Sequence, residues 1–561
     1  MMNYKLIPIF LATILFTLRG TTQTVGTLQN DASSLQGYTF FSPFSGTKAW
    51  IVDNCGQLIN SWDRGTRPGL SAYFLENGLM LRTYKADLEG PFTSASNAGG
   101  IELVDWDNNT VWQYEWNTPT ALSHHDAVFM PNGNILLLTW ELVYTDELIE
   151  LGRDPDEIAI EGFMWSEKIV EIEPVGSDDI NVIWQWEIKD HYIQDFDDSK
   201  QNYGVIADHP ELFNINLPDL NSSNSNATRD WNHFNSIDYN ESLDQILISV
   251  RNSDEIWIID HSTTTAEAAS HEGGLYGRGG DLLYRWGNAS AYERGAVNEQ
   301  KLFGQHGAHW IRDGLTDAGK IMFFNNGNGR PGPDFSTAEI LIPPQDANGG
   351  YIISGPNPFG PEEPEWVYGD QAGEDYYSPF LSNAQRLVNG NTLINSGSPG
   401  RIFEIDPDRN TVWQYEIPLF GDAPATQGGN INNNANFRAY KYPSDYPGFE
   451  GVDLTPGATI ENGENPLGCE IFVGLEELAQ NERPIAVQYF PGENSLRILN
   501  PQNEKAELFV IGVDGRFHQK ETINALEQTF QLRPDLKGVY FVQILSAKGE
   551  GYSEKLVLLG R

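Results

Sequence analysis

Histidines recur in this sequence at positions that suit a shared chemical site. The stretch SHHDAVFMPNGNILLLTWE sets His124 and His125 directly before Asp126, a strand, a tight turn and a second strand. A neutral imidazole can act as a nucleophile and carry protons near pH 7. One such histidine alone is more often an exposed or hydrogen-bonded loop residue. Five of the ten lie at the start of similar hairpins or between hairpins, which favours a common site: His124, His125, His233, His306 and His309.

The residues around these histidines favour an anionic ligand. His233 and Asn235 are two apart in DWNHFNSIDYN, so on an extended segment their side chains face the same way. Arg251 follows the next strand in LISVRNSDEIWIID, where a structural salt bridge is the alternative interpretation. Imidazoles, a guanidinium and an amide suit an anion better than a metal. A histidine-only metal site, with Asp126 as its one carboxylate, stays open.

Repeats along the chain predict how these distant residues could meet. One hairpin pattern, an apolar strand ending near an acid and a second strand closing in tryptophan, ends at Trp62, Trp112, Trp184, Trp286, Trp366 and Trp413. A second type with a polar turn lies between these hairpins, for example LENGLML and VNGNTL. Two hairpins make a four-stranded blade, so residues 25–465 predict a six-bladed β-propeller. Equivalent loops of a propeller converge at one end of its central channel.

The rest of the chain predicts three further segments. The apolar run of residues 6–18 after Lys5 is typical of a signal peptide, which we place at residues 1–24. The polar stretch 189–229 is predicted to be a long loop over one face, either a lid or a surface decoration. Residues 466–482 are predicted to be a linker, and residues 483–561, with short alternating strands, a small β-sandwich. The fold class is therefore all-β.

Composition excludes several partners. The chain has 35 lysines and arginines against 78 acidic residues, a formal net charge of −43. Nucleic acid and anionic membrane surfaces are poor partners for such a field, and no later stretch is apolar enough to span a membrane. Cys55 and Cys469 are the two cysteines. They could pair in an oxidising compartment or be two separate buried thiols, and the sequence favours neither.

Several motifs together resemble one known family. HHDAVFMPNGNIL, WNHFNSIDY followed by ILISVR and IWIID, GGDLLYRWGN, and FGQHGAHWI followed by GKIMFFNNGNGR are similar to the bacterial arylsulfotransferases, in order from about residue 25 to residue 465. The resemblance implies a six-bladed propeller. It also implies transfer of a sulfuryl group from a phenolic sulfate ester to another phenol, through a sulfurylated histidine and without a nucleotide donor. No cofactor or metal is expected.

The resemblance also implies a role for each candidate residue. His306 corresponds to the sulfurylated nucleophile. His125, His233, Asn235 and Arg251 correspond to the groups that hold the sulfuryl oxygens and assist the leaving phenol. The nucleophile could instead be His309, three residues further along. Trp140, Trp231 and Tyr239 are expected to provide aromatic walls for a phenol.

The chain departs from the family pattern at two places. Gly307 follows His306 where the family often has an aspartate, and FFNNG has Asn325 where an aspartate is common. Both departures could change the support around His306, although neither removes a proposed catalytic side chain.

The C-terminal segment resembles the sorting domain of the type IX secretion system, on LFVIGVDGRF, GVYFVQI and KLVLL. FPGEN stands where Pro-Asn-Pro is expected, and a carbohydrate-binding module is the alternative. The resemblance implies export by the signal peptide, then passage across the outer membrane by the type IX machinery, so that the protein is secreted or lies at the cell surface.

Two other functions compete with sulfuryl transfer. The propeller could bind sulfated glycans or a surface partner without catalysis. A quinone-cofactor dehydrogenase is disfavoured, because those propellers usually have eight blades and a calcium site with carboxylate ligands, and a fold alone does not assign chemistry.

Overall fold

The computed structural model divides the chain into two compact units, residues 1–470 and residues 471–561. It describes residues 23–217, 229–347, 349–370, 377–429, 431, 433–463 and 469, and in the second unit 486–490, 495–499, 505–512, 517–533, 538–546 and 551–558. Most of the predicted signal peptide and of the predicted linker lies outside these residues.

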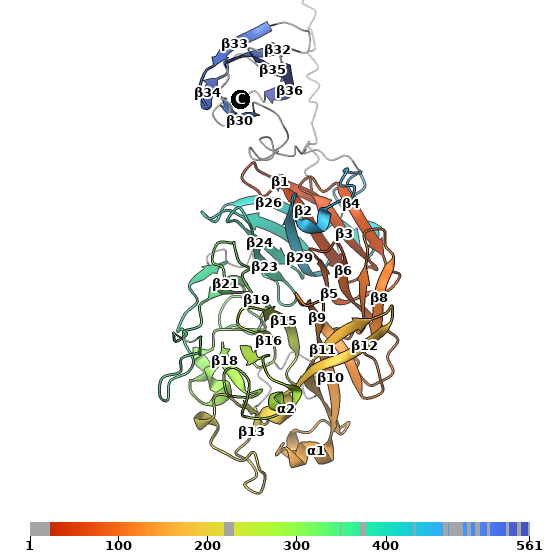
Figure 1. Ribbon diagram of the computed structural model, residues 1–561, viewed down its shortest axis with the longest axis vertical. Helices are drawn as coiled ribbons and strands as arrows, with labels where there is room; N and C mark the ends of the chain where they lie inside the picture. Colours follow the sequence, from red (N-terminus) through yellow and green to blue (C-terminus); the bar gives the residue numbers. More distant parts are fainter. Residues whose placement is uncertain are drawn as a thin grey trace, which may run out of the picture. The chain divides into compact units, whose positions relative to one another are not determined.

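The first unit is nearly all β-sheet (Figure 1). Three sheets have four strands each, in the orders β29 (Asn436–Pro443), β2 (Gly37–Pro43), β3 (Lys48–Asp53), β4 (Leu58–Asp63); β15 (Phe234–Asn240), β16 (Gln245–Val250), β17 (Glu255–Asp260), β18 (Leu282–Trp286); and β19 (His306–Trp310), β20 (Ile321–Asn325), β21 (Thr337–Leu341), β22 (Trp366–Tyr368). A five-stranded sheet has the order β23 (Asn383–Arg386), β24 (Thr392–Ser396), β25 (Arg401–Ile405), β26 (Thr411–Glu416), β1 (Gly26–Asn30).

The remaining large sheet has eight strands. Its order is β12 (Asp179–Glu187), β11 (Phe163–Val175), β10 (Ile135–Tyr144), β9 (Ala121–Phe129), β5 (Pro68–Phe74), β6 (Met80–Lys85), β7 (Gly99–Val104), β8 (Thr110–Glu115). All neighbours are antiparallel except β5 and β9, which join two sets of four strands through one parallel pairing, Leu70 with His125.

The innermost strands contact one another in a closed circle: β5 with β9, β9 with β15, β15 with β19, β19 with β23, β23 with β29, and β29 with β5. The arrangement is propeller-like, and these strands meet near the middle of the unit in Figure 1. It brings the starts of β9, β15 and β19, which carry the predicted site histidines, to a common centre.

The repeated tryptophans fasten neighbouring sets of strands. Five of the six have an indole large enough to fill the gap to the next set and donate the indole N–H across that gap. The bonds are Trp62 to Asp105 O (2.7 Å), Trp112 to Asp179 O (3.0 Å), Trp184 to Thr263 Oγ1 (3.0 Å), Trp286 to Pro361 O (2.7 Å) and Trp413 to Asn54 O (2.8 Å). The sequence repeat therefore records contacts between sheets.

The acids of the repeat organise the turns within the sheets. Asp105 Oδ1 accepts the Asn109 N–H at 2.7 Å, and Asp406 Oδ1 accepts the Asn410 N–H at 2.8 Å. Each carboxylate thus satisfies a main-chain donor that the tight turn leaves without a strand partner. In the other hairpin type Gly133 has a φ of +89°, which explains the glycine of the Asn-Gly pair.

The two ends of the unit are tied together. Strand β1 comes first in the chain and completes the sheet of β23–β26, while β29 comes last and begins the sheet of β2–β4. Cys55 and Cys469 form a disulfide, with their Cα atoms 5.4 Å apart. Of the two interpretations that the sequence left open, the paired one is found.

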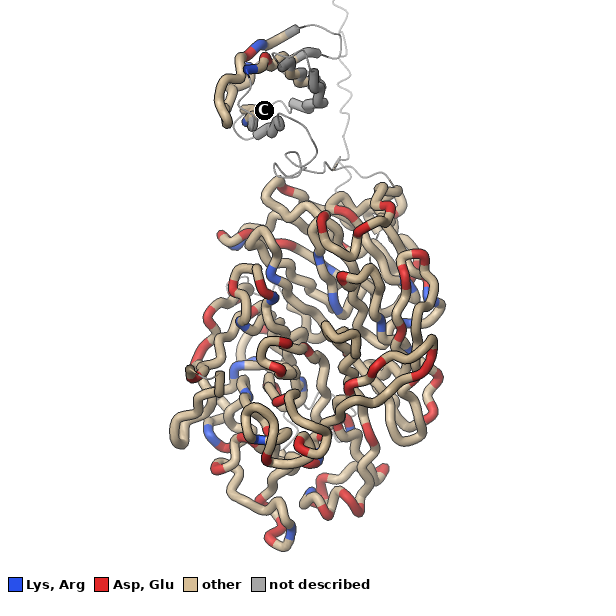
Figure 2. Tube along the Cα trace, viewed as in Figure 1, with Lys and Arg blue, Asp and Glu red and all other residues tan. Residues whose placement is uncertain are grey.

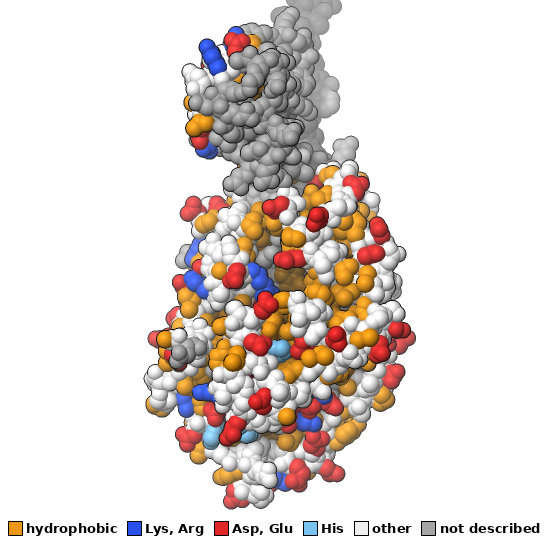
Figure 3. All heavy atoms as spheres, viewed as in Figure 1, with side chains coloured by type: hydrophobic (Ala, Val, Ile, Leu, Met, Phe, Trp, Pro, Cys, Tyr) orange, Lys and Arg blue, Asp and Glu red, His pale blue; other side chains and the backbone are white. Residues whose placement is uncertain are grey.

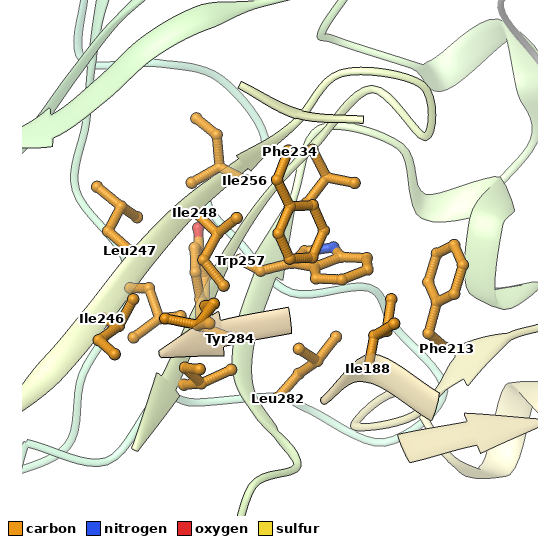
Figure 4. Close-up of a cluster of buried hydrophobic side chains, with 14 of the residues drawn as sticks. Ile188, Phe213, Phe234, Ile246, Leu247, Ile248, Ile256, Trp257, Leu282 and Tyr284 are labelled. Atoms are coloured by element: carbon orange, nitrogen blue, oxygen red, sulfur yellow. The ribbon is translucent and has the colours of Figure 1, made fainter. Parts of the chain in front are cut away.

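The main hydrophobic core lies under β15–β18 and the adjoining loops. Trp257 is fully buried there and packs against Phe234 and Phe213, with ring centroids 5.6 and 4.9 Å away (Figure 4). Truncating such a buried aromatic to alanine costs about 3 to 5 kcal/mol. This rigid block supports the start of β15.

The predicted loop 189–229 is partly ordered on this core. It contains η2 (Ile188–His191), β13 (Tyr192–Ile193), η3 (Ile206–Asp208) and β14 (Phe213–Asn214). Its Ile193, Ile206 and Phe213 are buried in the main core, so this part of the loop is packed rather than free. Residues 218–228 lie outside the described part, and the lid prediction is untested.

Helices are short. The remaining ones are α1 (Thr145–Glu150), α2 (Thr265–Ala268), η1 (Pro155–Glu157), η4 (Ala289–Tyr292), η5 (Val297–Glu299) and η7 (Pro447–Phe449), and β27 (Leu419–Phe420) pairs with β28 (Ala423–Pro424). Across the described ranges, none of the helices is long and apolar enough to cross a membrane.

The second unit contains two antiparallel sheets. Their orders are β30 (Ala486–Phe490), β31 (Ser495–Leu499), β34 (Glu527–Gln531), and β33 (Phe517–Ile523), β32 (Ala506–Gly512), β35 (Gly538–Ser546), β36 (Gly551–Leu558). Leu496 and Phe530 of one sheet and Leu508 and Val542 of the other belong to a single buried cluster. The unit therefore has its own core.

Acidic side chains dominate the charged positions along the trace (Figure 2) and are spread over the visible face among hydrophobic and neutral ones (Figure 3). A site for an anion must therefore hold its cations locally, inside the protein.

Candidate functional site

His306 begins β19 and is held in one orientation. It is 3% exposed, and its Nδ1–H donates to Gly304 O at 2.9 Å and to Asn326 Oδ1 at 2.8 Å. The Asn326 amide is itself fixed, because its Nδ2 donates to Ser378 O (2.7 Å) and Leu381 O (2.9 Å). Two acceptors on Nδ1 keep the proton there. The lone pair of His306 therefore lies on Nε2.

The surroundings also keep His306 neutral. Burial, followed by the charge of the nearby Arg251 guanidinium, lowers the pKa of His306 to about 3. A neutral imidazole with a free Nε2 lone pair is the form that attacks an electrophile.

The glycine after His306 has a structural reason. Gly307 has a φ of +65°, and a Cβ there would stand 2.9 Å from the Cβ of Asn383. An aspartate at this position would meet both the strained backbone and that contact. In this chain Asn326, the second asparagine of FFNNG, contacts Nδ1 of His306 instead.

His125 and His233 form a direct pair. Their Nε2 atoms are 3.1 Å apart, and Asp230 Oδ2 accepts from His233 Nδ1 at 2.6 Å. Both histidines have left-handed backbone, with φ of +47° and +58°. For residues with a Cβ this costs about 1 to 3 kcal/mol each and is concentrated at functional sites. Burial, and then the neighbouring imidazole of His233, holds the pKa of His125 well below its usual value.

His124 lies one layer deeper. It is fully buried and stacks on Trp140, with ring centroids 4.0 Å apart. Its Nδ1 is 2.8 Å from Nδ1 of His125, and its Nε2 is 3.0 Å from Oε2 of Glu167. His124 therefore supports its neighbour His125. Trp140 also belongs to this deeper layer, so it does not form the predicted substrate wall.

Arg251 and Asn235 border the same space. Arg251 is 9% exposed, its main-chain N–H donates to His233 O at 3.1 Å, and its Nη1–H donates to Asn252 Oδ1 at 3.0 Å. Asn235 donates from Nδ2 to Gln305 O at 2.7 Å, directly before His306. The Asn235 side chain therefore positions the start of β19, in addition to any contact with a ligand.

The structure adds a buried arginine that the sequence analysis missed. Arg438 on β29 pairs with Asp126 Oδ2 at 2.7 Å and donates to Asn235 O at 3.2 Å and to the Tyr73 hydroxyl. Burial lowers its pKa, but the Asp126 carboxylate outweighs this and holds the pKa of Arg438 above its usual value. Asp126 is thus committed to an ion pair. The sequence signal for Arg438 is an arginine between aromatic residues in NFRAY, and it lies outside the repeats.

One aromatic ring lies beside both His306 and His125. The Phe437 ring centroid is 6.2 Å from that of His306 and 6.3 Å from that of His125. The predicted walls Trp231 and Tyr239 pack elsewhere, Trp231 against Phe213 and Tyr239 against His261, so that part of the prediction is wrong.

The competing histidine has different neighbours. His309 Nδ1 lies 2.9 Å from Gly307 O, and the charged groups that act on it most are those of Asp238 and Arg312. By contrast, charges of Arg251 and His233 act on His306, and that of His306 acts on His125. Two observations therefore link the predicted residues: the Nε2 atoms of His125 and His233 are in direct contact, and the charges of Arg251 and His233 act on His306.

A separate group of side chains meets the distance criteria for a metal. The ligating atoms of His191, His271 and Asp281 lie within 4.8 Å of one another, beside a polar cavity of about 680 Å³ that is lined by His271 and Lys200 among others. Hydrogen bonds already satisfy both nitrogens of His191, to Asp281 Oδ1 and Ala268 O, each at 2.8 Å. It is the only such group in the described part of the chain, and the site histidines are not in it.

The sequence was compared with known proteins. A family model described as arylsulfotransferase (ASST) matches residues 109–412, more than half of the chain. No curated protein matches. Solved structures similar to this chain include a protein of unknown function from Bacteroides caccae (12% identity, 68% of this chain and 93% of that chain, TM-score 0.37) and the β-propeller domain of Cps50 (Swd1) from Myceliophteria thermophila (10% identity, 71% and 87%, TM-score 0.33). Structural likeness this low carries no argument about function.

Proposed function

Since this chain belongs to the arylsulfotransferase family, we propose that it transfers a sulfuryl group from a phenolic sulfate ester to another phenol through a sulfurylated His306. One observation carries the proposal: His306 is held neutral with its proton on Nδ1, and the charges of Arg251 and of His233, which pairs with His125, act on it. This set provides a nucleophile, a cation for the sulfate and a proton carrier for the phenol.

In the first step His306 Nε2 attacks the sulfur of the donor. The N–S bond forms, the S–O bond to the phenol breaks, and the electron pair stays on the phenolate oxygen. Arg251 stabilises the non-bridging oxygens as charge shifts toward the leaving group, an effect worth about 3 to 4 kcal/mol for a preorganised donor in a buried site. The His125–His233 pair supplies a proton to the phenolate.

In the second step the acceptor phenol gives its proton to the same imidazole pair. Its oxygen attacks the sulfur, the N–S bond breaks, and the lone pair returns to His306 Nε2. Because His306 and the imidazole pair both return to their starting states while the sulfuryl group ends on the acceptor, no nucleotide donor and no cofactor are needed.

For the architecture we infer six blades around a central channel, because six innermost strands form the circle of contacts and each begins a set of four strands. We also interpret the two C-terminal sheets as a β-sandwich.

We propose that the protein is exported and that its C-terminal unit is recognised by the type IX secretion machinery. The proposal rests on the sequence features of residues 1–24 and of the C-terminal strands. Fusing residues 483–561 to a periplasmic reporter tests it: the reporter should leave a cell that has the type IX system, and retention in the periplasm would contradict the proposal.

Replacement of His306 tests the proposed chemistry. His306→Asn should abolish release of phenol from a chromogenic phenyl sulfate in the presence of an acceptor phenol. His309→Asn is the matched control, because it changes a histidine of the same strand whose main charged neighbours are Asp238 and Arg312, and it should stay active. Activity retained in His306→Asn and lost in His309→Asn would make His309 the nucleophile. Binding of phenyl sulfates without turnover by the unmodified protein would favour a non-catalytic propeller.

A further inference from the structure

Five side chains form one continuous hydrogen-bonded chain that leads from the site into the core. The links join Glu167 to His124 (3.0 Å), His124 to His125 (2.8 Å), His125 to His233 (3.1 Å) and His233 to Asp230 (2.6 Å). All four distances are in hydrogen-bond range. Three imidazoles are thus connected in series, with a carboxyl group at each end.

Counting protons shows that this series of five side chains needs four protons, one more than three neutral histidines and two ionised carboxylates contain. Each of the four links needs one proton, and three neutral imidazoles supply three. A missing proton would leave two lone pairs facing each other in a buried place, which is costly. The fourth proton lies either on an imidazole or on a carboxyl group.

The environment favours Glu167 as its location. Glu167 is fully buried, and its Oε1 accepts the Trp140 indole N–H (3.2 Å) and the Phe234 main-chain N–H (2.9 Å), so Oε2 faces His124. Burial, and then the negative charge of Asp230, raises the pKa of Glu167 well above its usual value.

His124 and His125, the two imidazoles nearest to Glu167 in the series, disfavour binding of the fourth proton. Burial lowers the pKa of His124 to about 3, and it holds the pKa of His125 well below its usual value. One arrangement that agrees with these directions has protons on the carboxyl of Glu167, on Nδ1 of His124, on Nε2 of His125 and on Nδ1 of His233, where Asp230 accepts. In this arrangement every link is filled.

The other groups around the buried end do not replace this assignment. His233 and Asp126 are the remaining ionisable groups that change the pKa of Glu167 or His124. Glu167 in turn helps to raise the pKa of Tyr192. Asp126 is already neutralised by Arg438.

The chain opens toward the site at one end. The His233 side chain is 13% exposed, whereas that of Asp230 is 1% exposed and those of His124 and Glu167 are fully buried. His233 is therefore the member of this series that lies nearest to solvent, whereas Glu167 is closed to it.

We propose that Glu167 stores the proton that the leaving phenolate takes and the acceptor phenol returns, and that His124 conducts it. The inference rests on the proposed sulfuryl transfer. As the S–O bond breaks, the phenolate takes the proton of the His125–His233 link. One proton then moves from His124 to His125 and another from Glu167 to His124. The products are a neutral phenol and a Glu167 carboxylate, and the acceptor phenol reverses each movement.

Glu167→Gln tests the store. Glutamine can accept the same N–H groups and donate to His124, but it has no proton to release. For a donor whose phenol is weakly acidic, the single-turnover rate of phenol release should fall about 100-fold, with the donor KM unchanged. For a nitrophenyl sulfate, whose phenolate leaves without a proton, the rate should stay within about threefold.

Glu171→Gln is the matched control. Glu171 is also buried on β11 and accepts from a histidine, His261, at 3.1 Å, but it lies outside the chain. Its variant should show no dependence on the donor. His124→Phe keeps the stack on Trp140 and breaks the conduction, so it should reproduce the Glu167→Gln pattern, and the double variant should be no slower than either single one.

A readout without turnover separates this inference from the proposed function. Infrared spectra of the resting protein at neutral pH should show the carbonyl band of a buried protonated carboxyl, present in Glu171→Gln and lost in Glu167→Gln. An unprotonated Glu167, or a Glu167→Gln variant that slows both donors equally or neither, would overturn the proton store. Absence of phenol release from any phenyl sulfate by the unmodified protein would instead overturn the sulfuryl transfer.

Discussion

Arg251 is the residue whose replacement separates binding of the sulfate from control of the nucleophile. It is 9% exposed, so its charge acts in a buried site, and it is the largest charge effect on His306 after burial. Arg251→Met removes one preorganised cation from the sulfuryl oxygens, a loss of about 3 to 4 kcal/mol that corresponds to about 10² to 10³ in kcat/KM.

The same substitution should change the pH dependence. Without the guanidinium, one cause of the lowered pKa of His306 is gone, so its pKa rises from about 3 and the acid side of the pH profile moves to higher pH. The assay is the initial burst of phenol release from a chromogenic phenyl sulfate, followed from pH 4 to pH 8. Arg251→Lys keeps the charge but not the planar fork and should fall in between.

Arg312→Met is the control for loss of an arginine near the site. Its side chain is 60% exposed and pairs with Asp238 at 2.6 Å, so kcat/KM should be unchanged. A less than threefold loss in Arg251→Met, or an unmoved acid side of the profile, would refute the reasoning that Arg251 faces both the sulfate and His306.

Three further predictions follow from single contacts. Asn326→Leu removes one of two acceptors of the His306 Nδ1–H and should slow the first step about 10-fold at unchanged donor KM, measured by single turnover; a change in KM alone would contradict it. Trp413→Phe removes the indole bond to Asn54 O and should lower the free energy of unfolding in urea by about 1 kcal/mol, whereas an unchanged midpoint would show that the bond is unimportant. Acidification from pH 7 to pH 5 should destabilise the fold through His306, because the pKa of this residue in the folded protein is lowered to about 3. The unfolded chain binds the proton near pH 6.5 and the folded chain does not, so the free energy of unfolding should fall by about 2 kcal/mol. His306→Asn should remove this loss, and an equal dependence on pH in the variant would disprove it.

The sequence predicted those parts of the fold that depend on local patterns. Alternating strands, Asn-Gly turns and the spaced tryptophans indicated repeated hairpins, and the structure confirms a nearly all-β, propeller-like unit. The tryptophans are a reliable signal because each one contacts the next set of strands, as Trp62 does with Asp105.

The sequence also predicted that His125 and His233 belong to one site, because repeats place equivalent loops together, and their Nε2 atoms are 3.1 Å apart. It did not predict their support. Arg438 reaches the site only because the last strand closes the first sheet, a contact between segments more than 300 residues apart. Glu167 stands in a strand of alternating residues, and nothing local shows that its carboxyl is fully buried. Aromatic walls were predicted at Trp231 and Tyr239, whereas the ring that packs beside His306 is that of Phe437.

The central claim is that His306 carries the sulfuryl group between donor and acceptor. Mass spectrometry of the protein after incubation with a phenyl sulfate and no acceptor tests it most directly. The account predicts a mass increase of one sulfuryl group on the peptide containing His306, which disappears when a phenol is added and never forms in His306→Asn. An adduct on His309 or elsewhere, or phenol release without any adduct, would contradict it.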